Sequence, residues 1–367
     1  MRRTPSRRNS LAARRPLLGS ALLLVLVLAV GGQATAEPTH DRHFSLTAQP
    51  ESDPLDARPA ELPRPPDIDR LADPPGALDT DIGLTDSPDA TPAAGAAEPH
   101  VWWAALVSAG VVGGAAINSF TDDYSGGFHA ANEGWFGKNT YAGGADKASH
   151  FASFEIIAKE VDTFYRYLHF SPRQARIGGF VVSCLAGTII EIGDAGNKYG
   201  FSYEDLVADY LGAGAAVLIS ATGTADLVGF RFGPVPGPVP PHEVEGNGRD
   251  YSHEIYTADL KLAGLSERLG WHLGWARFLL LSATYGVKGY PYGTSETRER
   301  QVGFEVGLDF GSMLHAMNVG DETWWGIATH LVVDNVRIPF TAGGFRYDVN
   351  HDKWLGPDTG NSCGTCN

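Results

Sequence analysis

The sequence predicts an α+β fold, in which a compact four-helix unit is followed by a small antiparallel β-sheet. Two observations lead to this prediction. Apolar residues recur with helical spacing between residues 101 and 220, whereas they alternate with polar residues from Val302 to Phe310. The proline-rich run at residues 233–241 separates the two patterns and predicts a linker over residues 233–248.

The N-terminus has the pattern of a secretory signal peptide. Six arginines precede the apolar run from Leu17 to Val30, and the small residues Ala34, Thr35 and Ala36 follow it. We expect cleavage after Ala36, so that residues 1–36 are removed and the mature chain leaves the cytoplasm.

The next segment, residues 37–100, is acidic and rich in proline. It holds fourteen acidic residues and four arginines. Such a segment buries too little apolar surface to offset the entropy lost on ordering, so we expect a disordered linker.

The whole chain has a formal net charge of -15. This negative charge argues against a nucleic-acid partner, because phosphate binding needs positive charge.

Four helical segments are expected within the domain 101–232. They are Val101–Phe120, Asp146–His169, Arg173–Ile192 and Tyr203–Ser220. Ser202 precedes Asp205 by three residues, as in a capping box, and marks the start of the last helix. The first segment is about 20 residues long, which is enough to cross a bilayer. A membrane-inserted helix and a packed core helix both fit this segment.

The region 249–350 is expected to form the antiparallel sheet. From Val302 to Phe310 the apolar residues share one face of a strand, and weaker alternation runs through Tyr256–Leu262, Arg277–Val287 and Trp324–Phe340. We expect four or five strands in a half-buried sheet that packs against the helices or lies on a lipid surface. Residues 351–367 are expected to form a flexible tail.

Ionisable and polar side chains interrupt the apolar helices and predict a shared polar site. Charged groups are costly to bury, so their repeated use in apolar segments implies that they meet. Asp146 and His150 share one helix face at a spacing of four, and Asp205 and Asp209 share another. The predicted network comprises Asp146, Lys147, His150, Glu191, Asp194, Ser202, Asp205 and Asp209.

Acidic groups outnumber basic ones in this network, and two interpretations remain open. The first is a hydrogen-bonded network that orients the helices and binds nothing, and we favour it. The second is a site for a divalent metal such as Mg, Mn or Zn, since surplus negative charge needs protons or a cation. The expected metal ligands are Asp146, His150, Glu191 and Asp194.

The three cysteines allow at most one intramolecular disulfide. Cys363 and Cys366 lie close together in the tail and are the expected pair. Cys184 stands among apolar residues, which is typical of a core position.

Three runs of residues carry a resemblance to a known family. The runs N-E-G-W-F-G-K-N-T-Y-A-G-G-A-D-K-A-S-H-F, E-I-G-D-A-G and G-F-S-Y-E-D-L-V-A-D-Y-L-G-A resemble the YfiM-type family of predicted periplasmic or outer-membrane lipoproteins, a domain of unknown function. The elements D-K-x-x-H and S-x-x-D-L are also similar to those of VanZ-like integral membrane proteins. The resemblance covers residues 100–230, and more loosely the region to about residue 350.

The resemblance implies an envelope location and no established reaction. No cysteine stands near the expected cleavage site, so we expect membrane attachment through the helices or the sheet and not through a lipid anchor. Asp209 stands where the resemblance leads us to expect asparagine.

These observations predict an exported, membrane-associated envelope protein in the periplasm, non-enzymatic, with membrane lipid as its partner; the outer membrane is one candidate. The alternative is a metal-dependent hydrolase that acts on a lipid or cell-wall intermediate, with Lys147 steadying an anion and the four expected ligands as metal-binding or acid–base groups. A third hypothesis is a module that binds an apolar ligand between the helices and the sheet.

Overall fold

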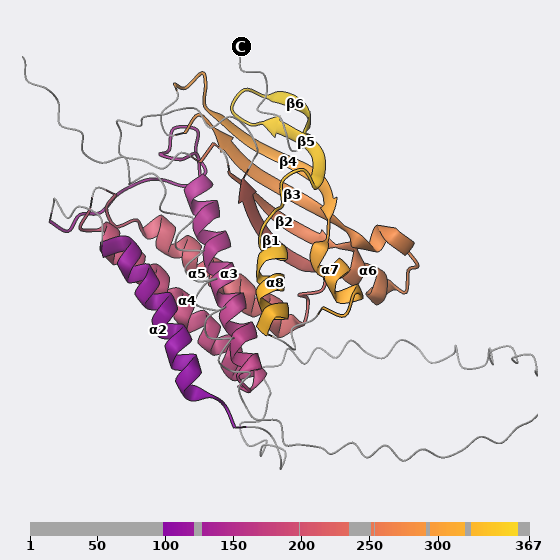
Figure 1. Cartoon of the computed structure of the whole chain (residues 1–367). Coiled ribbons are helices and arrows are strands. Elements are labelled where there is room, and N and C mark those ends of the chain that lie inside the picture. Colours follow the sequence, from indigo (N-terminus) through magenta and orange to yellow (C-terminus); the bar gives the residue numbers. More distant parts are fainter. Residues whose placement is uncertain are drawn as a thin grey trace, which may run out of the picture.

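A computed structural model describes residues 98–120, 127–197, 199–234, 251–252, 254–290, 294–319 and 324–358. The predicted α+β fold is confirmed: seven helices, four of them in the N-terminal part, accompany a six-stranded antiparallel sheet in these residues (Figure 1). The signal peptide, almost all of the acidic linker, and the expected Cys363–Cys366 disulfide lie outside the described residues.

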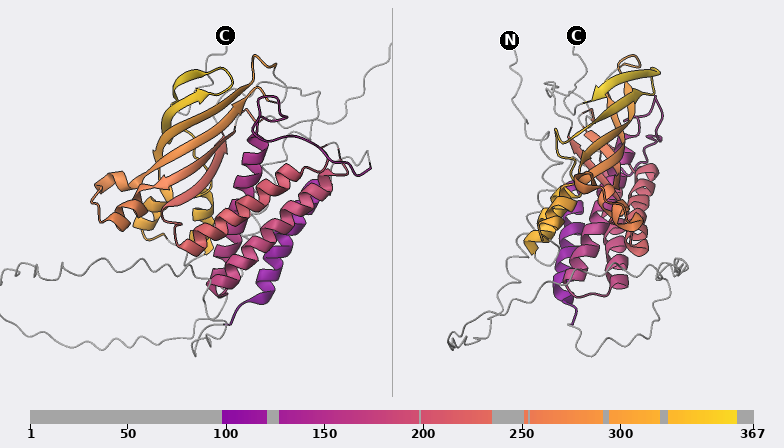
Figure 2. Two further views of the ribbon diagram at one scale, coloured as in Figure 1. Left: turned by 180° about the vertical axis from the view of Figure 1, so that it is seen from behind. Right: turned by 90° about the vertical axis from the view of Figure 1, so that its right-hand side faces the viewer.

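Four long helices form the first part of the fold. They are α2 (Val101–Phe120), α3 (Ala145–Tyr167), α4 (Pro172–Asp194) and α5 (Tyr203–Thr222), close to the predicted segments. Helix α3 packs against both α4 and α5, and α2 packs against α4. Figures 1 and 2 show these helices side by side next to the sheet. By length and composition, α2, α4 and α5 could each cross a membrane.

Local sequence signals start and stop two of these helices. The Ser171 hydroxyl accepts a hydrogen bond from the Gln174 N–H in a capping box, and Pro172 occupies the first turn of α4. Ser202 caps α5 as predicted, because its Oγ accepts a hydrogen bond from the Asp205 N–H at 3.2 Å. Helix α5 ends at Gly223, whose φ of 62° is a left-handed conformation that glycine adopts readily.

Glycines let α3 approach its neighbours closely. A Cβ atom on Gly212 of α5 would lie 2.1 Å from the Phe151 carbonyl oxygen, and one on Gly179 of α4 would lie 2.3 Å from the Ala158 carbonyl oxygen. The helix backbones are therefore nearly in contact. An apolar core lies between α2, α3 and α4, and Val107, Phe154, Val161, Phe164 and Val182 are among its buried residues.

The sheet has the sequential strand order β1-β2-β3-β4-β5-β6. Its strands are β1 (Val228–Pro234), β2 (Glu254–Lys261), β3 (Leu279–Lys288), β4 (Glu299–Leu308), β5 (Ala342–Asp348) and β6 (Lys353–Asp358). The connections carry α6 (Leu262–Leu269), the 3₁₀-helix η3 (Gly274–Phe278), α7 (Phe310–Ala316) and α8 (Trp324–Val333). Helix α3 also contacts β1, β2, β3 and α8, and so joins the two parts of the fold.

Some predictions about the sheet region were wrong. The segment Trp324–Phe340 was expected to be a strand, but its first ten residues form α8. Within this helix, Thr329 Oγ1 donates a hydrogen bond to the Trp325 carbonyl four residues earlier. The sheet begins at Val228, before the predicted linker, and its sixth strand lies within the predicted tail. Alternation in a single short strand is weak evidence when tertiary packing competes with it.

Around β4 the sheet buries its polar face and exposes its apolar face. Side chains of Val302, Phe304 and Val306 in β4 are 40%, 50% and 38% exposed, whereas Glu305 between them is buried. Glu305 Oε2 accepts a hydrogen bond from Arg337 Nη2 at 2.8 Å, and Arg231 forms a similar bidentate pair with Asp259. These ion pairs explain why the charged face can be buried. The alternative that the sheet lies on a lipid surface stays a prediction.

Candidate functional site: a buried charged centre

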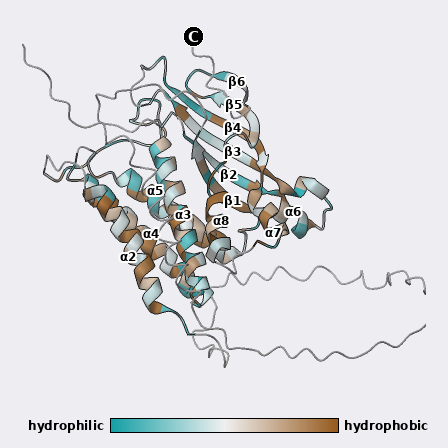
Figure 3. Cartoon of the chain, in the orientation of Figure 1, coloured by the Kyte–Doolittle hydropathy of each residue, from teal (hydrophilic) through white to brown (hydrophobic). Residues whose placement is uncertain are grey.

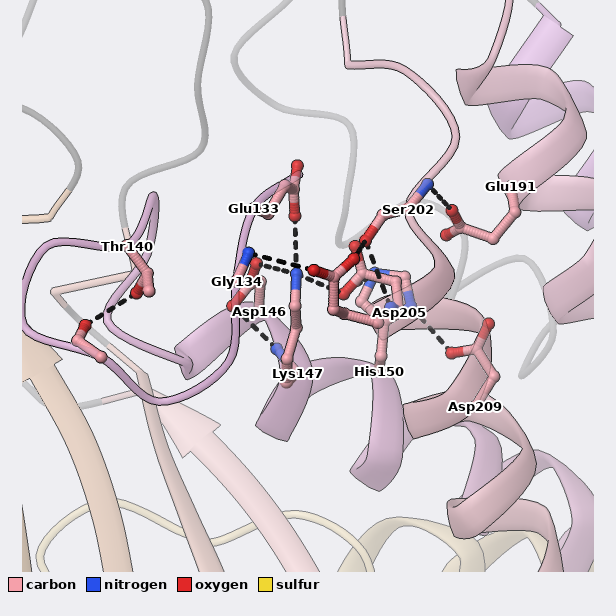
Figure 4. A network of polar contacts seen from close by, with 12 residues as sticks. Glu133, Gly134, Thr140, Asp146, Lys147, His150, Glu191, Ser202, Asp205 and Asp209 are labelled. Carbon is pink, nitrogen blue, oxygen red and sulfur yellow. Dashed lines mark hydrogen bonds and ion pairs between the residues drawn. The ribbon is translucent and has the colours of Figure 1, made fainter. Parts of the chain in front are cut away.

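The charged side chains meet where three helices end. The N-terminus of α3, the C-terminus of α4 and the N-terminus of α5 converge, and a loop that contains Glu133 covers them (Figure 4). A parallel bridge between Ala130 and Phe201 ties this loop to the segment before α5. The His129 N–H donates a hydrogen bond to the Ala195 carbonyl just beyond α4. These backbone contacts hold the loop over the helix ends.

One half of the centre is organised around Lys147, which is 1% exposed. Its Nζ lies 2.7 Å from Glu133 Oε2, 2.7 Å from Asp146 Oδ2 and 2.9 Å from Asp205 Oδ1. We name Glu133, Asp146 and Asp205 the lysine triad. A single buried ammonium group thus bridges the covering loop, α3 and α5.

The other half of the centre contains His150, Glu191 and Asp209, which we name the histidine triad. His150 Nδ1 lies 2.7 Å from Asp209 Oδ1, and its Nε2 lies 4.0 Å from Asp205 Oδ1. Glu191 Oε2 accepts a hydrogen bond from the Ser202 N–H at 2.9 Å. One potential ligand atom from each member of the triad lies within 4.8 Å of those of the other two.

Seven of the eight predicted residues meet in this centre, and neither triad includes Asp194. Asp194 Oδ1 accepts a hydrogen bond from Asn197 Nδ2 at 2.8 Å, within the turn after α4. The four expected metal ligands do not surround one point: Asp146 belongs to the lysine triad, and His150 and Glu191 to the histidine triad. Whether the gathered residues act as a functional site stays a prediction.

Two acidic residues of the centre were missed by the sequence analysis. Glu133 lies in the glycine-rich loop before α3, where no periodic pattern marks it as buried. Glu204 Oε1 accepts a hydrogen bond from the Gly134 N–H at 3.3 Å, and so also holds this loop. The position of Glu204 two residues after the cap Ser202 was the only available signal. The contact partners of a loop residue depend on the fold, which its spacing in the sequence does not reveal.

Burial and neighbouring charges shift the ionisation of the centre. Burial raises the pKa of Glu133, the Asp205 carboxylate raises it further, and Lys147 only partly offsets them, so that this pKa reaches about 8. Burial lowers the pKa of His150, but the carboxylates of Asp209 and Asp205 raise it more, to about 10. At neutral pH Glu133 therefore carries a proton and His150 is an imidazolium.

Acidic side chains outnumber basic ones in the described part of the centre. Six acids stand against Lys147 and His150: Glu133, Asp146, Glu191, Glu204, Asp205 and Asp209. Asp209 Oδ2 is buried and has no hydrogen-bond partner among the described residues. A buried surplus of negative charge is met by protons or by a cation, so the chemistry open to this centre is proton sharing or cation binding.

The comparisons with known proteins agree with an envelope location. Residues 132–221, which include the covering loop from Asn132 onward, helices α3 and α4, and α5 as far as Ala221, match a family model described as "Predicted periplasmic lipoprotein (DUF2279)". The narrower resemblances to YfiM-type and VanZ-like proteins stay predictions. No match was found among curated proteins or among solved structures. The family match supports the periplasm as the site of a chain whose biochemical role is unknown.

Proposed function

We propose that this chain is an exported, non-enzymatic envelope protein that binds membrane lipid through its apolar outer surface, while the buried charged centre ties its helices together. The observation that carries this proposal is an inverted distribution of side chains. In both parts of the fold, charged side chains are buried while apolar side chains lie on the outer surface, in addition to the apolar core of the helical part. In a water-soluble protein a large exposed apolar surface is unusual and marks an interaction site.

Helices α4 and α5 show the inversion in the first part of the fold. In α5 all three acids, Glu204, Asp205 and Asp209, are buried, whereas Val207, Leu211 and Leu218 are exposed. In α4 the single acid before the terminal Asp194 is Glu191, which is buried among exposed apolar neighbours. The exposed apolar side chains of α4 are Ile177, Phe180, Val181, Leu185 and Ile192. Hydrophobic residues follow α2 and α4 in Figure 3.

The sheet repeats the inversion. Strand pairing places Phe304 beside Ala283 on one side and beside Phe345 on the other, and all three side chains are exposed. On the opposite face, the same strands bury Ser282, Thr284 and Glu305. Polar residues inside and apolar residues outside are the arrangement of sheets that face lipid in transmembrane proteins.

The dimensions favour lipid over a protein partner. A helix of 20 residues, the length of α2 and of α5, extends about 30 Å, which is about the thickness of the hydrocarbon core of a bilayer. An exposed apolar strip that is free of charge over such a length matches a bilayer, whereas protein interfaces have polar rims.

The charged centre is suited to hold this arrangement together. Lys147 contacts carboxylates from three segments that are separate in the sequence, and breaking a buried ion pair is costly because it leaves an unpaired charge. The centre thus fixes the helix ends while their outer faces stay free for lipid.

Flotation with lipid vesicles tests this proposal. The full chain is mixed with vesicles of phosphatidylethanolamine and phosphatidylglycerol and centrifuged through a density gradient. We expect the wild type to float and the variant Phe304→Glu/Phe345→Glu to stay at the bottom. The matched control His272→Glu/Ser295→Glu adds the same charge at exposed positions that lie outside this apolar face, and it should float. A wild type that remains in the dense fraction would refute lipid binding.

A metal-dependent hydrolase acting on an envelope lipid or a cell-wall intermediate is the second candidate. It is favoured by the histidine triad, which offers an imidazole and two carboxylates. Incubation of the full chain with radiolabelled envelope lipids and cell-wall precursors, with and without Zn²⁺ or Mn²⁺, tests this candidate. Product that requires metal and disappears in His150→Gln would support hydrolysis, and the absence of product under every condition would exclude these substrates.

A binding module for an apolar ligand is less favoured by the described residues. The apolar cavity between α2, α3 and α8 is lined by Val107, Phe164 and Ile327, among others, and its volume is about 20 Å³. Such a volume accommodates about one water molecule and no lipid chain.

A further inference from the structure

We propose that His150, Glu191 and Asp209 form a binding site for one divalent metal ion of the zinc or manganese type. The proposal does not depend on lipid contact, because it rests on the geometry at the helix ends. One potential ligand atom from each of the three side chains lies within 4.8 Å of the others. Zinc bonds to nitrogen and oxygen ligands at about 2.0–2.2 Å, so these side chains need only small movements to close around one ion.

The neighbouring lysine triad is a comparable group of acidic side chains that already contains a cation. It is also a group of three potential metal ligands, but the Lys147 ammonium lies within 2.9 Å of an oxygen of each member. That triad therefore has its cation built into the chain. In the histidine triad, the only basic side chain in direct contact among the described residues is His150, which becomes a ligand when metal binding releases its ring proton.

An unpartnered atom points to the missing ligand. Asp209 is fully buried, its Oδ1 bonds to His150, and its Oδ2 has no hydrogen-bond partner in the described part of the chain. Figure 4 shows this second oxygen on the side of Glu191. A buried carboxylate oxygen without a partner is costly, and a bound cation would satisfy it.

The surrounding backbone leaves room for this carboxylate and fixes its neighbour. A Cβ atom on Gly187 would lie 2.5 Å from Asp209 Oδ2, so that only glycine at this position of α4 accommodates the side chain. The Ser202 N–H holds Glu191 Oε2 at 2.9 Å. A hydrogen-bonded ligand is already oriented, as the carboxylates of metal sites usually are.

The donor set selects the class of metal. One imidazole with two carboxylates suits borderline ions such as Zn²⁺ and Mn²⁺, whereas Ca²⁺ takes six to eight oxygen ligands. The His150 side chain is 21% exposed, so an ion has access from solvent and a water molecule could complete the coordination.

Calorimetric titration of the full chain tests this site. The protein is treated with a chelator, returned to metal-free buffer, and titrated with ZnCl₂ and separately with MnCl₂. We expect one ion per chain for at least one of the metals. Glu191→Gln and Asp209→Asn should each weaken binding at least about tenfold, the smallest loss that mutation of an outer-shell partner typically causes.

Glu133→Gln is the matched control. It replaces a glutamate with glutamine, as Glu191→Gln does, but it lies in the lysine triad and outside the proposed metal site. It should leave the metal affinity unchanged. The proposal is overturned if the wild type binds neither ion stoichiometrically, or if Glu133→Gln weakens binding as much as Glu191→Gln does.

A measurement on the wild type keeps the test decisive if the ligand variants do not fold. In chain labelled with ¹⁵N-histidine, Zn²⁺ should shift the ring nitrogen signals of His150, while those of the exposed His129 stay in place. Shifts confined to other histidines would overturn the proposal.

Discussion

The helical part and the sheet both bury charged side chains, but they balance the charge differently. In the sheet region two buried arginines each pair with one carboxylate: Arg231 with Asp259, and Arg337 with Glu305. In the charged centre of the helical part, six acidic side chains gather around two basic ones, Lys147 and His150. In a one-to-one pair the two charges neutralise each other, so the pair stabilises the fold without needing a ligand. A surplus of one sign needs protons or an ion, so the helical part is where a ligand is expected.

Removal of Lys147 should produce the largest loss of stability, because it takes away one of the two basic groups of the charged centre. Lys147→Met leaves the buried carboxylates of Asp146 and Asp205 without their ammonium partner, and we expect a loss of about 3–5 kcal/mol in the free energy of unfolding. Urea unfolding followed by circular dichroism measures this loss. A variant as stable as the wild type would show that the centre does not tie the helices together.

Removal of Arg337 tests whether the sheet pairs are self-contained. Arg337→Met isolates the Glu305 carboxylate and should cost about 3 kcal/mol, at the lower end of the range for broken buried pairs. The double variant Arg337→Met/Glu305→Leu should recover most of this loss in urea unfolding, because both charges are gone. A matching double variant, Lys147→Met/Asp205→Asn, should recover less, since Glu133 and Asp146 remain. Equal recovery in both would remove the distinction between the two parts.

Two glycine-to-alanine variants in α5 test the close packing of this helix against α3. Gly212→Ala places a methyl group against the Phe151 carbonyl, and we expect a loss of about 1–3 kcal/mol from overpacking. Gly214→Ala is the matched control, because no atom lies within 4 Å of its Cβ position. It should raise stability by about 0.5–1 kcal/mol through higher helix propensity. Thermal unfolding that ranks the two variants in the opposite order would contradict the packing described for α3 and α5.

The last prediction concerns a pH dependence that originates in the lysine triad. Burial and Asp205 raise the pKa of Glu133 from 4.5 to about 8, so between these values the folded chain holds a proton that the unfolded chain has released. Stability from this group is therefore present below pH 4.5 and is lost as pH rises toward 8. Glu133→Gln should flatten this part of the curve of thermal midpoint against pH. An unchanged slope would show that Glu133 ionises normally.

Much of the fold could be read from the sequence, and the helices were the clearest case. Their long apolar periodicity and the cap Ser202 located all four N-terminal helices to within a few residues. The sheet was less predictable: α8 was mistaken for a strand, and β1 and β6 were missed. These segments are short, and their conformation depends on neighbours that are distant in the sequence, such as the bridge from Val336 to Phe232.

The candidate site was partly predictable for the same reason. Spacing four apart placed His150 near Asp146 on one helix, and charge within apolar segments singled out Asp205 and Asp209. These sequence patterns did not reveal that Glu133 contacts Lys147 from a loop, or that the Asp194 side chain bonds to Asn197. A helix fixes which residues share its face, but the residues that face one another across helices are set by how the helices pack.

The sequence by itself determined the α+β order of elements and the presence of surplus acid within apolar helices, because periodicity and composition are local properties. Only the tertiary structure decided which side of each element faces inward. Alternation along β4 defines two faces equally well, and the ion pair between Glu305 and Arg337 buries the polar one. Likewise, only the meeting of three helix ends divides the acids into a triad filled by Lys147 and a triad that leaves Asp209 Oδ2 without a partner.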